Sequence, residues 1–417
     1  MGQDVTVLPT EGAREGLRTA TTAETSGRLG RWPGLDVARG VVVGGLIPFH
    51  AALVFDATDD FYVKSDRTVD LTPFAAPVVV AAMPLLFLVA GIGARYAWRA
   101  RSAGAYLRRR VRRLLVPLVA GTVLLVPLPV WLRLRADPDY TEAYLDFWPR
   151  FLRVRWSWSD FPFVVQPAAG GRGFETGHLW FLYLLLLYSL AVVPLLIWLG
   201  SSRGDRVVRL LAAGAERRGV VLLPAVLFGA VAAGLGLDQG IAAGNALGYL
   251  LFFAAGVVLA SDVRFPAVLR CNAGLAGAVA IALLAVAGAA LVGGDGDPLL
   301  DRDPVDLVGR AAFGAAGWCA VVSIVGWLAR LRPSSGRAAG DRSPGRRVGR
   351  YVVPAVLAWY VLHQPIVVGV AYLVVGSTLH PVLEYLLICV ASALGTLVAY
   401  DLLVRRTALT RALFAGT

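Results

Sequence analysis

Long apolar runs, separated by short polar stretches, fill most of this chain. A helix needs roughly 20 mainly apolar residues to cross ~30 Å of hydrocarbon, and many runs approach or exceed that length. The predicted spans are residues 35–55, 74–95, 114–133, 178–200, 219–237, 244–260, 273–293, 305–329, 352–376 and 382–404. The pattern predicts an all-α integral membrane protein, a polytopic bundle of about ten transmembrane helices.

The composition agrees with a membrane protein and argues against a nucleic-acid partner. Of the 417 residues, 57% are hydrophobic and only 16% are charged, whereas soluble domains carry about a quarter charged residues. The net charge is +12, but the basic residues form short clusters between apolar runs instead of one basic domain. Three widely spaced cysteines predict neither a disulfide framework nor a metal site.

Arginine is concentrated on alternate loops. Clusters precede the first run, follow the tenth, and fill the loops after the second, fourth, sixth and eighth runs. The loop at 294–304, on the opposite side, is acidic. Because cytoplasmic loops carry an excess of Lys and Arg, both termini are predicted to be cytoplasmic. We expect a multi-pass protein of the inner (cytoplasmic) membrane, surrounded by membrane lipids.

The domain organisation follows from the same pattern. Residues 1–34 are polar and contain no apolar segment of a signal peptide, which predicts a disordered cytoplasmic tail. Residues 35–405 form the membrane domain, and residues 406–417 form a second cytoplasmic tail. The long outer loop at 134–177 contains tryptophans, which suggest a segment at the membrane interface or a lid over a site.

His50 lies deep inside the first predicted span, where an ionisable side chain is costly and marks a functional site. Arg39 precedes His50 by 11 residues, which returns to nearly the same helix face about 16 Å away. Asp36 lies within about 60° of both and can pair with Arg39 at i,i+3. One interpretation is a simple ion pair at the helix entry beside a buried imidazole. We favour the other, in which all three line a functional stripe centred on His50.

A second polar set lies in the ninth span, where His363 and Gln364 precede Pro365. His363 lies at a depth similar to that of His50, so the two can share one site. The alternative is a proline-kinked helix whose polar groups satisfy the freed carbonyls. His178, followed by Trp180, opens the fourth span; interfacial His and Trp are also common anchors.

The densest basic cluster runs from Arg108 to Arg113, before the third span. Anchoring at the cytoplasmic surface and attraction to anionic lipid explain such a cluster without any ligand. Arginine forks at i,i+3 also suit a phosphate-bearing ligand presented from the cytoplasm. Composition alone favours the anchoring interpretation.

Four short motifs, in order along the chain, resemble the membrane acyltransferase-3 family, and the last two resemble its glucan succinyltransferase-type subgroup. They are Gly34-Leu35-Asp36-x-x-Arg39-Gly40 followed by His50, Arg110-x-x-Arg113-Leu-Leu-Val-Pro117, Gly177-His178-Leu179-Trp180-Phe181-Leu182 and Leu362-His363-Gln364-Pro365. Arg109-x-x-Arg112 is an adjacent register of the arginine motif. Many members also carry Trp-Ser-Leu-x-x-Glu in span four; that glutamate is absent here, so no role is carried over for it.

The resemblance implies O-acyl transfer from a cytoplasmic acyl-CoA, acetyl-CoA or succinyl-CoA, used as a co-substrate with no permanently bound cofactor and no metal. Arg109, Arg110 and Arg113 would bind the donor phosphates, and Asp36 and Arg39 would order the inner half of the path. His50 would act as general base on an acceptor hydroxyl. Further candidates would orient the acceptor or stabilise the oxyanion; they are His363, Gln364, His178 and Trp180.

The acceptor is open at this point: a glycan, a glycolipid or a small hydroxylated metabolite. Some family members carry an extracytoplasmic hydrolase-like domain that this sequence does not show, so we expect the chain to acylate its acceptor by itself. The competing function is a transporter or flippase that binds an anionic or glycosylated substrate through the same histidines and arginines. Inverted hydropathy repeats would favour it, and none stands out in the sequence.

Overall fold

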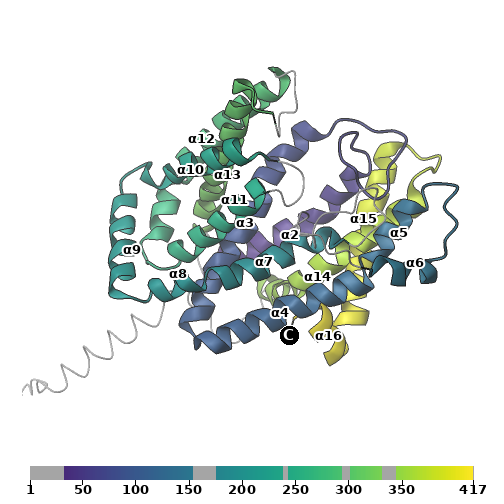
Figure 1. Cartoon of the computed structure of the whole chain (residues 1–417), viewed down its shortest axis with the longest axis horizontal. Helices are drawn as coiled ribbons and strands as arrows, with labels where there is room; N and C mark the ends of the chain where they lie inside the picture. Colours follow the sequence, from purple (N-terminus) through teal and green to yellow (C-terminus); the bar gives the residue numbers. More distant parts are fainter. Residues whose placement is uncertain (1–31, 154–174, 238–242, 294–300, 331–343, 417) are drawn as a thin grey trace, which may run out of the picture.

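A computed structural model describes residues 32–153, 175–237, 243–293, 301–330 and 344–416. Over these residues the chain is helical, and the single β-bridge that they contain joins Asp56 and Val69. Figure 1 shows the arrangement of the helices. In chain order they are α2 (Pro33–Leu53), α3 (Thr72–Arg99), α4 (Ala103–Leu124), α5 (Pro127–Leu134), α6 (Tyr144–Phe151), η2 (Gly177–Leu179), α7 (Trp180–Ala191), α8 (Val193–Trp198), α9 (Ser202–Ala215), η3 (Val220–Leu222), α10 (Pro224–Leu235), α11 (Ala243–Leu259), α12 (Phe265–Gly293), α13 (Pro304–Leu328), α14 (Pro344–Val374), α15 (Pro381–Ala399), η4 (Tyr400–Val404) and α16 (Ala408–Phe414).

Seven helical segments of the described chain are long and apolar enough to cross a membrane. An eighth is added if α9 and η3–α10, which meet at 117°, are one broken span. Two shorter apolar helices, Gly177–Ala191 and Asn245–Leu259, complete the set. The protein is therefore a polytopic helical membrane protein, whereas the number of about ten spans and the orientation of the termini stay predictions.

Several helices differ from the predicted spans. Helices α12 and α14 begin at Phe265 and Pro344 instead of 273 and 352, and the third and fourth spans differ in ways that bear on the site. The third begins at Ala103, 11 residues before the predicted start at 114, so the arginine cluster is helical. Arginine is a good helix former, and the Ser102 side chain caps the new start by accepting from the amide of Ala105. The fourth predicted span is divided into η2, α7 and α8, with Pro194 in the first turn of α8, because proline cannot donate to the preceding turn.

Glycines allow the closest helix contacts. A Cβ on Gly91 of α3 would lie 2.0 Å from the Phe253 carbonyl oxygen of α11, and one on Gly256 of α11 would lie 2.0 Å from the Leu88 carbonyl oxygen of α3. At the start of α2, a Cβ on Gly34 would lie 2.8 Å from the Leu328 carbonyl oxygen of α13. Small residues at helix interfaces are typical of membrane bundles, where packing replaces the hydrophobic effect between helices.

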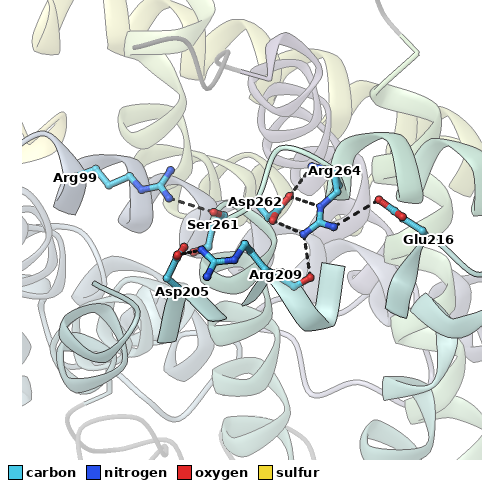
Figure 2. A network of polar contacts seen from close by, with 7 residues as sticks. All are labelled: Arg99, Asp205, Arg209, Glu216, Ser261, Asp262 and Arg264. Carbon is cyan, nitrogen blue, oxygen red and sulfur yellow. Dashed lines mark hydrogen bonds and ion pairs between the residues drawn. The ribbon is translucent and has the colours of Figure 1, made fainter. Parts of the chain in front are cut away.

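A polar network at one end of the bundle connects α9 with α3 and with the α11–α12 turn (Figure 2). Its members are Arg99, Asp205, Arg209, Glu216, Ser261, Asp262 and Arg264. Arg264 donates to both oxygens of Asp262 and to the Arg209 carbonyl, and its Nη1 lies 3.7 Å from Glu216 Oε1. Hydrogen bonds from Arg264 lower the pKa of Asp262. Exposed pairs contribute little stability each, so this network mainly sets the position of α9.

The segment between α2 and α3, residues 54–71, is a compact cap, and we call it the α2–α3 cap. Lys64 Nζ donates to the carbonyl oxygens of Leu53 and Asp59 at 3.0 and 2.7 Å, and also to that of Asp56. The Asp56 carboxylate accepts from the amides of Thr58 and Leu71, at 3.0 and 3.3 Å. These bonds satisfy the cap's backbone and give it a defined shape.

Candidate active site

Three histidines from three segments meet in the bundle. The ring of His363 on α14 lies 5.2 Å from that of His50 on α2 and 5.3 Å from that of His178 on η2, measured between centroids. His363 and His178 are buried, whereas His50 is partly exposed. Residues separated by more than 300 positions thus form one cluster, which we call the histidine cluster.

The hydrogen bonds of His363 determine its tautomer. Its Nδ1 lies 2.7 Å from the Tyr360 carbonyl oxygen, which can only accept, so Nδ1 carries the proton. Nε2 is then a lone-pair acceptor; it is buried and has no hydrogen-bond partner among the described residues. An unpaired buried acceptor is costly in a low-dielectric interior, and such an atom is a candidate for contact with a substrate or with another ring.

His178 is held by a carbonyl that Pro365 sets free. Pro365 has no N–H, so the carbonyl of Val361, four residues earlier, lacks its helical donor. His178 Nε2 donates to this oxygen at 3.0 Å. The Tyr360 hydroxyl donates back to the His178 carbonyl oxygen. The proline of the Leu-His-Gln-Pro motif thereby fixes a histidine on a different helix.

His50 completes the cluster with its ring stacked on the α2–α3 cap. Phe61 lies 5.8 Å from it at an interplanar angle of 18°. His50 Nδ1 is buried and, like His363 Nε2, has no partner within the described chain. The two rings that are closest across α2 and α14 therefore each present an unsatisfied nitrogen.

The other polar residues of α2 lie further along the same helix. Arg39 and Asp36 form the ion pair expected from their spacing, at 3.6 Å. Arg39 also donates to the Val89 carbonyl of α3 at 3.0 Å. The pair is partly exposed, and Arg39 lies about 16 Å from His50 along a straight helix, so neither residue reaches the ring directly.

Gln364 and Trp180 are separated by the fold. Gln364 is buried next to His363, and its Oε1 has no partner among the described residues. Trp180 instead stacks on Tyr249 of α11 at 5.8 Å and lies 6.5 Å from Phe87 of α3. Trp180 thus belongs to an aromatic cluster beside α3 and α11.

The arginines of α4 occupy one stretch of helix. Arg110 is partly buried with its guanidinium 5.5 Å from the centre of the Tyr106 ring, whereas Arg109 and Arg113 are exposed. Helix α16 packs against α4, and a Cβ on Gly416 would lie 2.5 Å from the Arg113 carbonyl oxygen. The C-terminal helix therefore lies beside the arginines.

The geometry of α4 relates these arginines to the histidine cluster. Gly121 of α4 packs under the histidine-bearing turn, since a Cβ there would lie 2.6 Å from Leu179 Cδ1. Arg110 precedes Gly121 by 11 residues, which is about 16 Å and nearly the same helix face. The same spacing separates Arg39 from His50 on α2. Arg39 of α2 and Arg110 of α4 thus lie at a similar distance along their helices from the depth at which the histidine cluster lies.

The sequence did not identify two neighbours of the cluster. Phe61 lies outside every predicted span. It belongs to the α2–α3 cap, whose sequence has no regular hydrophobic period, so its contact with His50 was not predictable. Glu175 is buried and accepts a hydrogen bond from the Tyr62 hydroxyl. The sequence shows a glutamate three residues before His178, but it does not show that Tyr62, in another loop, is its hydrogen-bond partner. Of the tryptophans in the outer loop, Trp148 lies on α6 and donates to the Val123 carbonyl oxygen at 2.8 Å, whereas those at 156 and 158 lie outside the described residues.

Metal binding receives no support from the described residues: no group of three or more His, Cys, Asp and Glu side chains among them has a metal-site arrangement. Two of the three imidazoles already use one nitrogen on a backbone carbonyl. The cluster instead offers unpaired nitrogen and amide atoms for proton transfer and hydrogen bonding.

Comparison with known proteins gives the reaction class. No curated protein and no solved structure matches the chain. The model of the acyltransferase-3 family, described as an acyltransferase domain, matches residues 32–401. This match covers most of the sequence and all three histidines of the cluster, so the chain belongs to the membrane acyltransferase-3 family and is an acyltransferase.

Proposed function

We propose that this chain is an O-acyltransferase of the inner membrane that moves an acetyl or succinyl group from cytoplasmic acyl-CoA to a hydroxyl group. The acceptor would be a glycan, a glycolipid or a small metabolite, and the motifs around His178 and His363 resemble those of the glucan succinyltransferase-type subgroup. The family supplies the reaction class. One observation carries the site assignment: His50 and His363, from helices far apart in sequence, lie 5.2 Å apart with unpaired nitrogens.

His50 is the proposed general base, and His363 orients it. A modest rotation of the rings would let His50 Nδ1–H donate to His363 Nε2, which would satisfy both unpaired atoms. His50 would then be held in the tautomer that presents Nε2 as the base, the arrangement that a third group enforces in catalytic triads. Because His363 Nδ1–H is committed to the Tyr360 carbonyl, neutral His363 serves better as an acceptor than as an oxyanion donor.

The chemical step is a simple exchange of bonds. His50 removes the proton of the acceptor hydroxyl as its oxygen attacks the thioester carbonyl. The new C–O bond forms, the C–S bond breaks, and the proton passes from His50 to the leaving thiolate. The Gln364 amide is the proposed donor to the oxyanion, while His178 holds the turn of α14 that precedes Pro365 through the Val361 carbonyl.

The donor would enter from the arginine end. Arg110 and Arg113, with Arg109 beside them, would bind its phosphates through charge-assisted hydrogen bonds. Arg39, paired with Asp36, would line the route. A pantetheine arm that spans roughly half the ~30 Å core would bring the thioester to the histidine level, which matches the spacing along α2 and α4.

Purified protein in liposomes, supplied with radiolabelled acetyl-CoA or succinyl-CoA and envelope glycans or hydroxylated metabolites, tests the proposal. Label should appear covalently in the acceptor with the wild type and not with His50→Ala. Movement of a labelled ligand into the liposomes without any acylated product would instead favour a transporter.

A further inference from the structure

The α2–α3 cap reaches the histidine cluster and the turn before His178 through two adjacent side chains. Phe61 stacks on His50, as described above. Tyr62, the next residue, donates its hydroxyl hydrogen to Glu175, three residues before His178. The ring of Phe61 and the hydroxyl of Tyr62 are both buried. One rigid dipeptide therefore touches the α2 histidine on one side and the turn that carries His178 on the other.

The turn before His178 is shaped around Tyr62. Gly177 has a φ of +50°, a left-handed conformation that favours glycine. A Cβ there would lie 3.1 Å from the Tyr62 hydroxyl oxygen and 3.3 Å from Val126 Cγ1. The chain thus passes close to Tyr62, and a side chain at position 177 would press on the Tyr62 hydroxyl.

Arg133 of α5 holds Tyr62 from the other side. Its guanidinium carbon lies 4.4 Å from the centre of the Tyr62 ring, a favourable cation–π distance. Arg133 Nη2 also donates to the Asp60 carbonyl oxygen at 2.7 Å. Together with the Lys64 bonds that shape the cap, these contacts leave Tyr62 little freedom of position.

Burying the Glu175 carboxyl group costs folding free energy, which a contact that only holds a loop would not require. Desolvation raises the pKa of Glu175, against the smaller opposing effects of Tyr62 and Arg133. An apolar pair would close the same gap without burying a carboxyl group. A hydrogen bond, in contrast, fixes a distance and a direction between the two segments that it joins.

From this geometry we infer that Tyr62 and Glu175 are positioning residues for acyl transfer: their hydrogen bond fixes the separation of His50 from the His178–His363 pair by holding Phe61 against the His50 ring. The inference rests on the proposed function for its catalytic consequence. Neither residue touches the reacting atoms; each acts through the ring that it places. Misplacing a reacting group by ~1 Å costs about 10²-fold in rate.

The chain contains a matched control with the same chemistry elsewhere. Tyr140 donates to Glu142 at 2.5 Å, and Arg150 donates to Glu142 Oε1 at 3.1 Å. This second Tyr–Glu–Arg cluster is only partly buried, and none of its described contacts involves a histidine. Loss of a hydroxyl there tests the general cost of losing such a bond.

The experiment compares Tyr62→Phe, Glu175→Leu, Glu175→Gln and Tyr140→Phe in liposomes. We expect Tyr62→Phe and Glu175→Leu to lower kcat by about 10-fold to 100-fold with little change in the donor KM. Glu175→Gln retains an acceptor for Tyr62 and should restore most of the kcat. Tyr140→Phe should match the wild type. Size-exclusion profiles and melting temperatures check that each variant folds.

A second measurement does not depend on turnover. Diethylpyrocarbonate modifies accessible imidazoles, and mass spectrometry locates the product. Tyr62→Phe should increase the rate at which His50 is modified several-fold, whereas Tyr140→Phe should not. If the folded Tyr62→Phe protein keeps the wild-type kcat and the wild-type His50 labelling rate, the inference is wrong. If the wild type transfers no acyl group, the proposed function fails, and the labelling rates still decide whether the pair positions His50.

Discussion

The histidine cluster and the arginine segment of α4 are built in different ways. Three segments far apart in sequence supply His50, His178 and His363, and their rings lie within contact distance of one another. The arginines come from consecutive turns of one helix. Of the three proposed to bind the acyl-CoA phosphates, Arg109 and Arg113 are exposed. A site assembled from several helices depends on each of its contacts. A site on one helix has neighbouring guanidinium groups that can substitute for one another.

The largest expected effect is the loss of His50. His50→Ala should reduce acyl transfer by at least about 10³-fold, because it removes the proposed base. Product formation from labelled acyl-CoA measures the effect. His380→Ala is the matched control, since His380 is exposed at the start of α15, and it should stay near the wild-type rate. A folded His50→Ala protein with substantial turnover would exclude His50 as the base.

Removal of the orienting ring should cost less. His363→Ala leaves His50 in place but removes the acceptor for its Nδ1–H, so kcat should fall by about 10²-fold. The double variant His50→Ala/His363→Ala should be hardly slower than His50→Ala alone, because residues that act as a unit are not additive. Additive losses in kcat would show that the two rings act independently.

The arginine segment should respond in KM instead of kcat. Arg110→Ala should raise the donor KM by about 10-fold, the loss expected for one charge-assisted contact, while Arg110/Arg113 double replacement should raise it further. Arg108→Ala, which removes an exposed arginine of the same helix, should change KM less than about 2-fold. If Arg108→Ala and Arg110→Ala change the donor KM equally, the segment does not bind the donor specifically and acts as an anchor to anionic lipid.

Pro365 offers a way to loosen the histidine cluster without touching a histidine. In Pro365→Ala the new N–H can bond the Val361 carbonyl and compete with His178. We expect kcat to fall by several-fold, while the melting temperature stays the same or rises because the helix regains a hydrogen bond. A fall in both activity and melting temperature would mean that Pro365 serves the fold and not His178.

The smallest expected effect concerns pH. Burial raises the pKa of Glu175 above its usual value of 4.5, so the folded state binds this proton more tightly than the unfolded chain. The stability that Glu175 contributes is present below pH 4.5 and is lost as the pH rises through the raised pKa. Melting temperatures measured across that range should decline less for Glu175→Gln than for the wild type, and equal slopes would argue against this proton.

The sequence predicted those features that depend only on residues within one helix. The spacing of Asp36 and Arg39 predicted their ion pair, which is confirmed at 3.6 Å, and apolar run length predicted the long membrane helices. The helix α4 begins 11 residues before the predicted span at 114, because arginines lower the hydropathy of a segment without preventing it from being helical. Hydropathy indicates which part of a helix lies in the bilayer; it does not indicate where the helix begins or ends.

Other features had no signal along a single segment. Equal depth made a meeting of His50 and His363 compatible with the sequence, but depth says nothing about which helices are neighbours. The pairing of Tyr62 with Glu175 joins residues 113 positions apart, and neither loop shows a period. His178 and Trp180 contact different neighbours because residues two positions apart do not share a helix face, and η2 continues directly into α7.

By itself, the sequence determined the membrane class, the polar residues that a bilayer would exclude, and the spacing of Arg39 and His50 along one helix. These are local properties, since hydropathy and the 3.6-residue turn act within a segment. Tertiary structure decided which rings meet, which nitrogen of His363 stays free, and which cap residue covers His50. Those depend on close helix contacts and on a carbonyl released by Pro365, and both exist only once distant segments have packed together.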